Sequence, residues 1–153
     1  MSVHRYNATC HWVGTTAVGY EQYDRTHSAA GPPAELEPRL SADPAFRGDA
    51  ALLNPEQLLV MAAASCQLLE FLARAARARV NVVEYDDHAE GAMDDAQQPA
   101  RIVRIELRPE ISVEAGTSEE RVLKLVDQAH RGCYIANSLN TEIALTPKVR
   151  VQR

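Results

Sequence analysis

The segment from Asn54 to about Arg79 constrains the fold most, because it predicts one long helix with an unusual surface. Asn54 is a good N-cap, Pro55 suits the first helical position, and Gln57 completes a capping-box-like start. No Gly or Pro follows before Arg79. The first half, residues 58–69, is apolar nearly all round, so we expect it to be buried on every side. A small single sheet does not give that much cover, which favours a second copy of the chain as its partner.

The rest of the chain alternates strands with two shorter helices. Polar and apolar positions alternate in a way that predicts strands at residues 3–13, 17–23, 81–93, 101–113 and 142–151. Prolines exclude a long helix from residues 28–53, which we expect to form a long loop. Further helices are expected at Glu119–His130, capped by Thr117 or Ser118, and from Cys133 to about residue 139. This order predicts an α+β fold in which helices pack on a mostly antiparallel sheet, in a single domain over residues 1–153.

Composition excludes several classes of function. The net charge of −5 leaves no broad basic face, so we expect no nucleic-acid partner. No apolar run approaches the roughly 20 residues that span a bilayer, so we expect no membrane partner. The N-terminal sequence has no apolar signal core, so we expect no export. Three cysteines in a chain without a signal peptide indicate a reducing, cytoplasmic location.

Two of the three cysteines interrupt segments that otherwise have ordinary helical patterns. Cys66 lies in the long helix and Cys133 begins the short one. A thiol in such a place suggests redox chemistry, provided that a cation or base lowers its pKa and a second thiol lies near. Cys10, in an alternating strand, is expected to be a buried apolar filler. The histidines match no zinc pattern with these cysteines, so we expect no metal site and no cofactor.

Paired motifs around the two cysteines resemble the OsmC/Ohr superfamily of osmotically inducible and organic hydroperoxide resistance proteins. They are Asn-Pro-Glu-Gln-Leu-Leu at 54–59 followed by Ala-Ser-Cys at 64–66, and then Ala-His-Arg-Gly-Cys-Tyr-Ile-Ala-Asn-Ser at 129–138. The resemblance extends over almost the whole chain, including residues 23–27 and 41–49. It is nearer to OsmC-like relatives than to Ohr itself, because Ohr-type proteins usually have Cys-Pro where this chain has Cys133-Tyr134.

The resemblance implies a thiol-dependent peroxidase that reduces organic hydroperoxides in oxidative-stress defence. It also implies an intertwined homodimer of OsmC-like domains, with long central helices and the reactive sites at the interface. Cys66 matches the peroxidatic cysteine, Cys133 the resolving cysteine and Glu56 the carboxylate of the site. An external dithiol, often of lipoyl type in relatives, would reduce the enzyme again.

Arg25 is the best match for the arginine that activates the thiol, with Arg39 and Arg47 as alternatives in the same variable region. Helical geometry agrees that the cation comes from elsewhere, because no residue three or four positions from Cys66 is basic. Ten residues of helix also place Glu56 about 15 Å from Cys66. Either the carboxylate comes from a partner chain whose helix packs antiparallel, or it acts only at a distance. The apolar first half of the helix favours the partner chain.

Two other functions remain open on the same fold. The protein could be a module that binds an apolar ligand and senses oxidation through its cysteines, or a structural dimer with inert thiols.

The start of a short helix is expected to favour the thiolate of Cys133.

Overall fold

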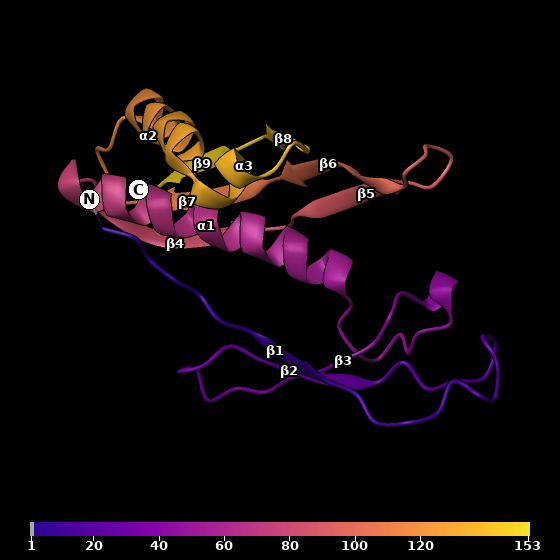
Figure 1. Ribbon diagram of the computed structural model, residues 1–153. Helices are drawn as coiled ribbons and strands as arrows, with labels where there is room; N and C mark the ends of the chain where they lie inside the picture. Colours follow the sequence, from indigo (N-terminus) through magenta and orange to yellow (C-terminus); the bar gives the residue numbers. More distant parts are fainter. Residues whose placement is uncertain (1) are drawn as a thin grey trace. The chain divides into compact units, whose positions relative to one another are not determined.

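The structure is a computed structural model, and it describes residues 2–153 (Figure 1). The chain divides into two compact units, one running up to Leu58 and the other from Leu59 to Arg153. Sheets are present in both, and the second holds α2, α3 and most of α1. The predicted α+β class is confirmed, whereas the single domain stays a prediction.

The N-terminal unit is built on a three-stranded antiparallel sheet of order β1-β2-β3. Its elements are β1 (Thr9–His11), β2 (His27–Ala30), β3 (Arg39–Leu40) and a short 3-10 helix, η1 (Pro44–Phe46). The strand expected at residues 3–13 is thus only three residues long. The expected loop at residues 28–53 is interrupted by β2, β3 and η1.

Turns join β1 to β2, so the strand predicted at residues 17–23 is wrong. Gly19 has a φ of 90°, and the amides of Gln22 and Tyr23 both donate to its carbonyl oxygen. Only glycine reaches that φ without strain. The turn geometry therefore outweighs the alternation of apolar residues on which the strand was predicted.

The long helix α1 (Pro55–Arg77) begins where the capping signal predicts. The Asn54 side chain accepts a hydrogen bond from the Gln57 amide at 2.8 Å, and the Gln57 side chain accepts one from the Asn54 amide at 3.0 Å. This reciprocal pair is a capping box. The helix ends two residues early because Arg79 has a left-handed φ of 56° and the Val80 amide bonds back to the Ala75 carbonyl at 2.9 Å.

Only one stripe of α1 is buried within the chain, and it consists of Ala63, Gln67, Phe71 and Ala75. The opposite stripe exposes four large apolar side chains, those of Leu58, Met61, Leu69 and Leu72. The expectation that the first half is buried on every side is therefore wrong for one chain alone. An apolar face of α1 remains uncovered, with 63% of Leu69 exposed.

α1 also corrects the expectation about apolar runs. By length and composition alone it could cross a membrane, because an 18-residue window within it has a mean hydropathy of 1.5. The core helix of a soluble protein meets the same criterion, so this property is weak evidence for a membrane. The absence of a membrane partner stays a prediction.

Two three-stranded sheets form the C-terminal unit, in the orders β4-β7-β9 and β5-β6-β8. Their strands are β4 (Val82–Asp87), β5 (Glu90–Asp94), β6 (Arg101–Leu107), β7 (Pro109–Val113), β8 (Glu142–Leu145) and β9 (Lys148–Val151). The β4–β7 and β5–β6 pairs are antiparallel, and the β6–β8 and β7–β9 pairs are parallel. Each long strand predicted over 81–93, 101–113 and 142–151 is therefore broken into two shorter strands, one in each sheet.

The remaining helices are α2 (Glu119–Gly132) and α3 (Tyr134–Ser138). Both were predicted. Of the two candidate caps, Thr117 and Ser118, it is Ser118 that caps α2, by accepting a hydrogen bond from the Arg121 amide at 3.3 Å. A packed core joins α1, α2 and β7, and it includes Phe71, Ile111, Val113, Val122 and Val126. This core holds α2 against α1.

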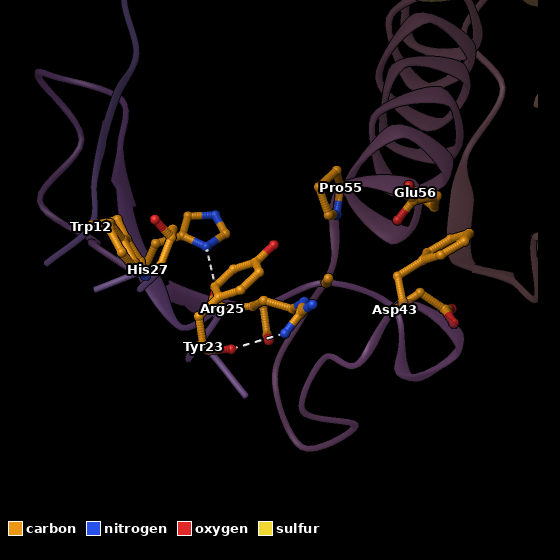
Figure 2. Close-up of a pocket in the computed structure, with 11 residues that line it drawn as sticks. Trp12, Tyr23, Arg25, His27, Asp43, Pro55 and Glu56 are labelled. Atoms are coloured by element: carbon orange, nitrogen blue, oxygen red, sulfur yellow. Dashed lines mark hydrogen bonds between the residues drawn. The ribbon is translucent and has the colours of Figure 1, made fainter. Parts of the chain in front are cut away.

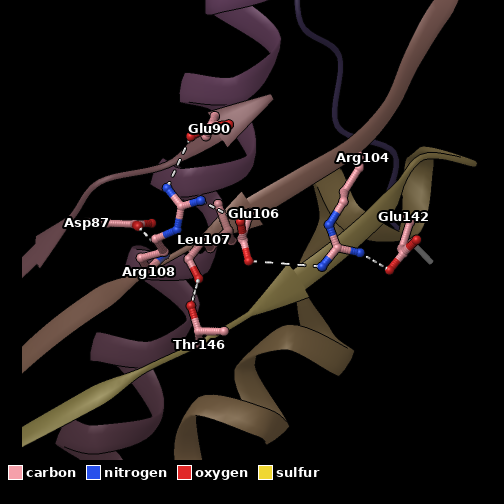
Figure 3. A network of polar contacts seen from close by, with 8 residues as sticks. All are labelled: Asp87, Glu90, Arg104, Glu106, Leu107, Arg108, Glu142 and Thr146. Carbon is pink, nitrogen blue, oxygen red and sulfur yellow. Dashed lines mark hydrogen bonds and ion pairs between the residues drawn. The ribbon is translucent and has the colours of Figure 1, made fainter. Parts of the chain in front are cut away.

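Charged side chains form a ladder that centres on β6 (Figure 3). Arg104 pairs with Glu142 and Glu106, and Arg108 pairs with Glu106 and Glu90. Solvent reaches these groups, so each pair contributes little to stability. The ladder is a solvated surface and leaves the other face of β6 to the core residues Ile105 and Leu107.

Candidate functional site

Cys66 and Cys133 lie against each other, although they are far apart in the sequence. Cys66 projects from α1 and is partly exposed, whereas Cys133 is 2% exposed at the junction of α2 and α3. A hydrogen bond joins their two side chains, and both are free thiols. Packing of α2 on α1 thus brings together the two thiols that the sequence singles out.

Burial makes the two thiols chemically different. Burial raises the pKa of Cys133 from 9.0 to about 11, and the hydrogen bond with Cys66 adds to that rise. The Ala136 amide donates to the Cys133 sulfur at 3.4 Å and opposes the shift, but its effect is smaller. The expected preference of Cys133 for its thiolate is therefore wrong, because loss of solvent outweighs the helix start.

Burial gives the two thiols different roles. Cys133 resists loss of its proton because it is buried and hydrogen-bonded with Cys66. Cys66 is also the more accessible sulfur of the two. This arrangement suits Cys66 to meet a reagent from outside and Cys133 to react second.

An open cavity of about 380 Å³ lies beside Cys66. Its walls come from α1 and from the start of α3, and they are Ala62, Ser65, Cys66, Leu69, Glu70, Tyr134 and Ile135. Glu70 lines this cavity, although no motif in the sequence indicates a role for it. Its position one helical turn after Cys66 was the available signal.

The other two predicted site residues, Arg25 and Glu56, line a cavity of about 450 Å³ in the N-terminal unit (Figure 2). Its walls are Trp12, Thr16, Tyr23, Arg25, His27, Ser41, Ala42, Asp43, Phe46, Pro55 and Glu56. Aromatic rings and one guanidinium therefore face the same space. Gly48 packs under this wall, where a Cβ would lie 1.6 Å from the Ala42 carbonyl oxygen.

Arg25 is held in place by two tyrosines, to which the sequence alone assigns no role. Its guanidinium donates to the carbonyl oxygens of Tyr23 at 2.8 Å and Tyr20 at 2.7 Å. It also lies 3.9 Å from the ring centre of Tyr23 and 4.8 Å from that of Tyr20. Arg25 is 9% exposed, so a desolvated cation faces the cavity with its geometry fixed.

Glu56 lines the same cavity but forms no ion pair with that guanidinium within the described residues of one chain. Within residues 2–153, Arg25 makes no ion pair, and its partners are the tyrosine carbonyls and rings. The alternatives to Arg25 lie outside this cavity: Arg39 is exposed, and Arg47 forms an exposed ion pair with Glu21. Among the three arginines, only Arg25 lines the pocket with Glu56.

Two further expectations concern the other cysteine and the histidines. Cys10 is exposed on β1, so its role as a buried filler is wrong. His27 donates from Nδ1 to the Arg25 carbonyl at 2.8 Å, and its ring lies in the cavity wall. In the part of the chain that the structure describes, no three His, Cys, Asp or Glu side chains are grouped to hold a metal.

The predicted site residues thus form two pairs. Cys66 and Cys133 make a dithiol, which can exchange two electrons by forming a disulfide. Arg25 and Glu56 share a cavity that contains a fixed positive charge beside apolar rings. Each pair lies in its own unit of the chain.

Solved structures with the same fold come from several bacteria. An OsmC-like protein of unknown function from Vibrio cholerae is 28% identical, with a TM-score of 0.85 over 95% of this chain and 100% of that one. An organic hydroperoxide resistance protein from Elizabethkingia anophelis with thiocyanate bound is 18% identical, with a TM-score of 0.73 over 99% of each chain. An organic hydroperoxide resistance protein from Legionella pneumophila is 16% identical, with a TM-score of 0.70 over 99% of this chain and 100% of that one.

No curated protein sequence matches this chain. A sequence model of one family does match, over residues 48–148, which include α1 with Cys66, α2 and Cys133. The family is described as OsmC-like protein. Because the match covers most of the chain and the fold agrees, this chain belongs to the OsmC-like protein family.

Proposed function

We propose that this protein is a cytoplasmic, thiol-dependent peroxidase that reduces organic hydroperoxides in oxidative-stress defence. The observation that carries the proposal is the pair of hydrogen-bonded thiols, one accessible and one buried, beside an open cavity. Membership of the OsmC-like family supports it, as does the common fold with two organic hydroperoxide resistance proteins.

In the first step the Cys66 thiolate attacks the terminal oxygen of the hydroperoxide. The O–O bond breaks, a Cys66 sulfenic acid forms, and the alkoxide leaves as an alcohol after it takes up a proton. In the second step the Cys133 sulfur attacks the sulfur of Cys66. Water leaves, and a Cys66–Cys133 disulfide forms.

An external dithiol then reduces the disulfide and returns both thiols. A lipoyl-type dithiol is the leading candidate for this reductant. Nothing in the cycle requires a cofactor or a metal from this chain.

Arg25 and Glu56 act on Cys66 across the interface of a homodimer in this proposal. The guanidinium of Arg25 stabilises the thiolate and holds the peroxide oxygen, while Glu56 orients the bound substrate. The uncovered apolar stripe of α1 supports a second copy as its cover. The apolar cavity walls at Trp12, Tyr23 and Phe46 suit the organic group of the peroxide.

Peroxide consumption by purified protein tests the proposal. We expect cumene hydroperoxide to be consumed with dihydrolipoamide as reductant, and much faster than hydrogen peroxide. Cys66→Ser should abolish consumption, and Cys133→Ser should allow one turnover and leave a sulfenic acid that dimedone traps. Full multiple-turnover activity in Cys66→Ser would refute the assignment of the attacking thiol.

The same cavities favour one alternative, a module that binds an apolar ligand and senses oxidation. It predicts that oxidation of Cys66 is stoichiometric and that no dithiol supports turnover. Saturable binding of a long-chain alcohol without peroxide consumption would favour the alternative.

A further inference from the structure

An ion pair on α1 lies beside the dithiol and has no role in the steps above. Glu70 follows Cys66 by one helical turn and shares its cavity. Arg74 donates to Glu70 Oε1 from Nε at 3.0 Å, and its Nη2 lies 2.7 Å from the same oxygen. The side chains of Arg74 and Glu70 are only 32% and 20% exposed, so the pair is partly shielded from solvent.

This pair packs directly on the backbone that leads into Cys133. A Cβ on Gly132 would lie 2.5 Å from Arg74 Nη2 and 2.8 Å from Glu70 Oε1, closer than real Cβ atoms approach. Gly132 is the last residue of α2, and Cys133 follows it. The Arg74 guanidinium thus lies at the carboxyl end of α2, where a positive charge is favourable.

We propose that the Glu70–Arg74 ion pair clamps the end of α2 onto α1 and so sets how fast the Cys66–Cys133 disulfide forms. Glu70 and Arg74 are then positioning residues for the second step, and Gly132 is the place where they hold the chain. The inference rests on the proposed function in taking that step as part of the cycle.

The clamp acts on one balanced reaction. The S–OH bond of Cys66 and the S–H bond of Cys133 break, the S–S bond forms, and hydroxide leaves with the proton as water. The hydroperoxide of the first step has already supplied the oxidising equivalents. A shift of about 1 Å in the position of the Cys133 sulfur is enough to slow such a step greatly.

Two variants and one control test the clamp. Glu70→Gln removes the charge, and Gly132→Ala displaces the pair while leaving both of its side chains intact. Asp127→Asn is the control. It breaks the Asp127–Arg131 ion pair, which has the same four-residue spacing and also lies near Cys133, but is exposed to solvent. After one equivalent of cumene hydroperoxide, rapid quenching and mass spectrometry follow the sulfenic acid and the disulfide.

We expect Glu70→Gln and Gly132→Ala to form the disulfide about tenfold more slowly than the wild type once Cys66 is oxidised. Gly132→Ala, which leaves the cavity residue Glu70 in place, should oxidise Cys66 at the wild-type rate. The longer-lived sulfenic acid of the two variants should also be converted more readily to sulfinic acid by excess peroxide. Asp127→Asn should match the wild type. Disulfide formation at the wild-type rate in both variants would overturn the inference.

Gly132→Ala separates positioning from general stability. Alanine is the better helix former, and the atoms it meets are the ends of flexible side chains, so its unfolding midpoint should equal or exceed that of the wild type. A slower disulfide in a protein that is no less stable supports the clamp. A slower disulfide that accompanies a lower midpoint in both variants would assign the effect to stability and overturn it.

Equilibration in glutathione redox buffers tests the clamp without peroxide. We expect the effective concentration of Cys133 towards Cys66 to be about tenfold lower in the two variants than in the wild type. Equal values would overturn the clamp. A wild type that forms its disulfide in glutathione but does not react with hydroperoxides would refute the proposed function. The effective concentrations of the variants would still support or refute the clamp in that case.

Discussion

At the scale of single residues, burial divides the work between two chemically identical thiols. Cys133 holds its proton more tightly than a free thiol because burial and its hydrogen bond with Cys66 raise its pKa. Burial makes ionisation of this thiol more costly in the folded protein than in the unfolded chain, so the free energy of unfolding depends on pH. The protonation of Cys133 is therefore linked to stability as well as to reactivity.

This linkage predicts a loss of stability at high pH. Between pH 9 and about 11 the unfolded chain loses the Cys133 proton while the folded protein keeps it, so the free energy of unfolding falls as the pH rises. Urea unfolding of reduced protein at pH 8 and pH 10.5, at one protein concentration, measures the fall. It should be larger in the wild type than in Cys133→Ser, which has no such group.

The raised pKa of Tyr85, caused mainly by burial, adds a fall in the same direction. Tyr85 is present in both proteins, so its contribution cancels in the comparison. An equal pH dependence in the wild type and in Cys133→Ser would contradict the buried, protonated state of Cys133.

Arg25 gives a second prediction at this scale. Arg25→Ala should slow the alkylation of Cys66 by iodoacetamide near neutral pH, because the cation that is proposed to stabilise the thiolate is lost. Arg47→Ala is the matched control, since Arg47 is exposed and paired with Glu21. An unchanged rate in Arg25→Ala together with a slower one in Arg47→Ala or Arg39→Ala would transfer the role.

At the scale of elements, the start of α1 links stability to the proposed site. The Asn54 cap orders the turn that contains Pro55 and Glu56, two residues of the N-terminal cavity. Asn54→Ala should lower the free energy of unfolding by about 1 kcal/mol. Chemical denaturation measures that loss, and a change of less than a few tenths of a kcal/mol would show that the cap is dispensable.

Local chemistry explains which elements could be predicted from the sequence. The capping residues Asn54, Ser118 and Cys133 act on their own neighbours, so α1, α2 and α3 were predicted with nearly correct bounds. The strands were not, because Pro109 and the turn at Gly19 break alternating patterns that extend across them. Which sheet each half strand joins depends on long-range pairing that no local pattern contains.

The candidate site divides in the same way. Motifs identify Cys66, Cys133, Arg25 and Glu56. They do not distinguish Arg25 from Arg39 and Arg47, whereas the structure does, because Arg25 lines the cavity and the other two arginines do not. The tyrosine cage of Arg25 and the packing of Arg74 on Gly132 were missed. Both depend on how turns and helices meet in space.

At the scale of the whole molecule, the apolar stripe of α1 needs a cover. Leaving this stripe in water costs roughly 25 cal/mol for each Å² of apolar surface. Light scattering should therefore give a mass of about twice 16.9 kDa at micromolar concentration. Met61→Lys, which places a charge in the stripe, should shift the mass towards that of one chain.

An active monomer in the wild type would reject the proposed interface. A dimer that persists unchanged in Met61→Lys would instead place the contact on another surface. Activity measured alongside mass distinguishes a dimer needed for chemistry from one needed only for solubility.

The separation of the two thiols along the chain has a consequence for the lifetime of the protein. The stretch between Cys66 and Cys133 contains four of the six strands of the C-terminal unit and all of α2. A covalent ring of about 67 residues would restrict the unfolded chain and make unfolding harder by about 4 kcal/mol. The reduced protein would then be more sensitive to proteases than the disulfide form. Peroxide, which produces the disulfide, would therefore lengthen the lifetime of the protein molecules that consume it.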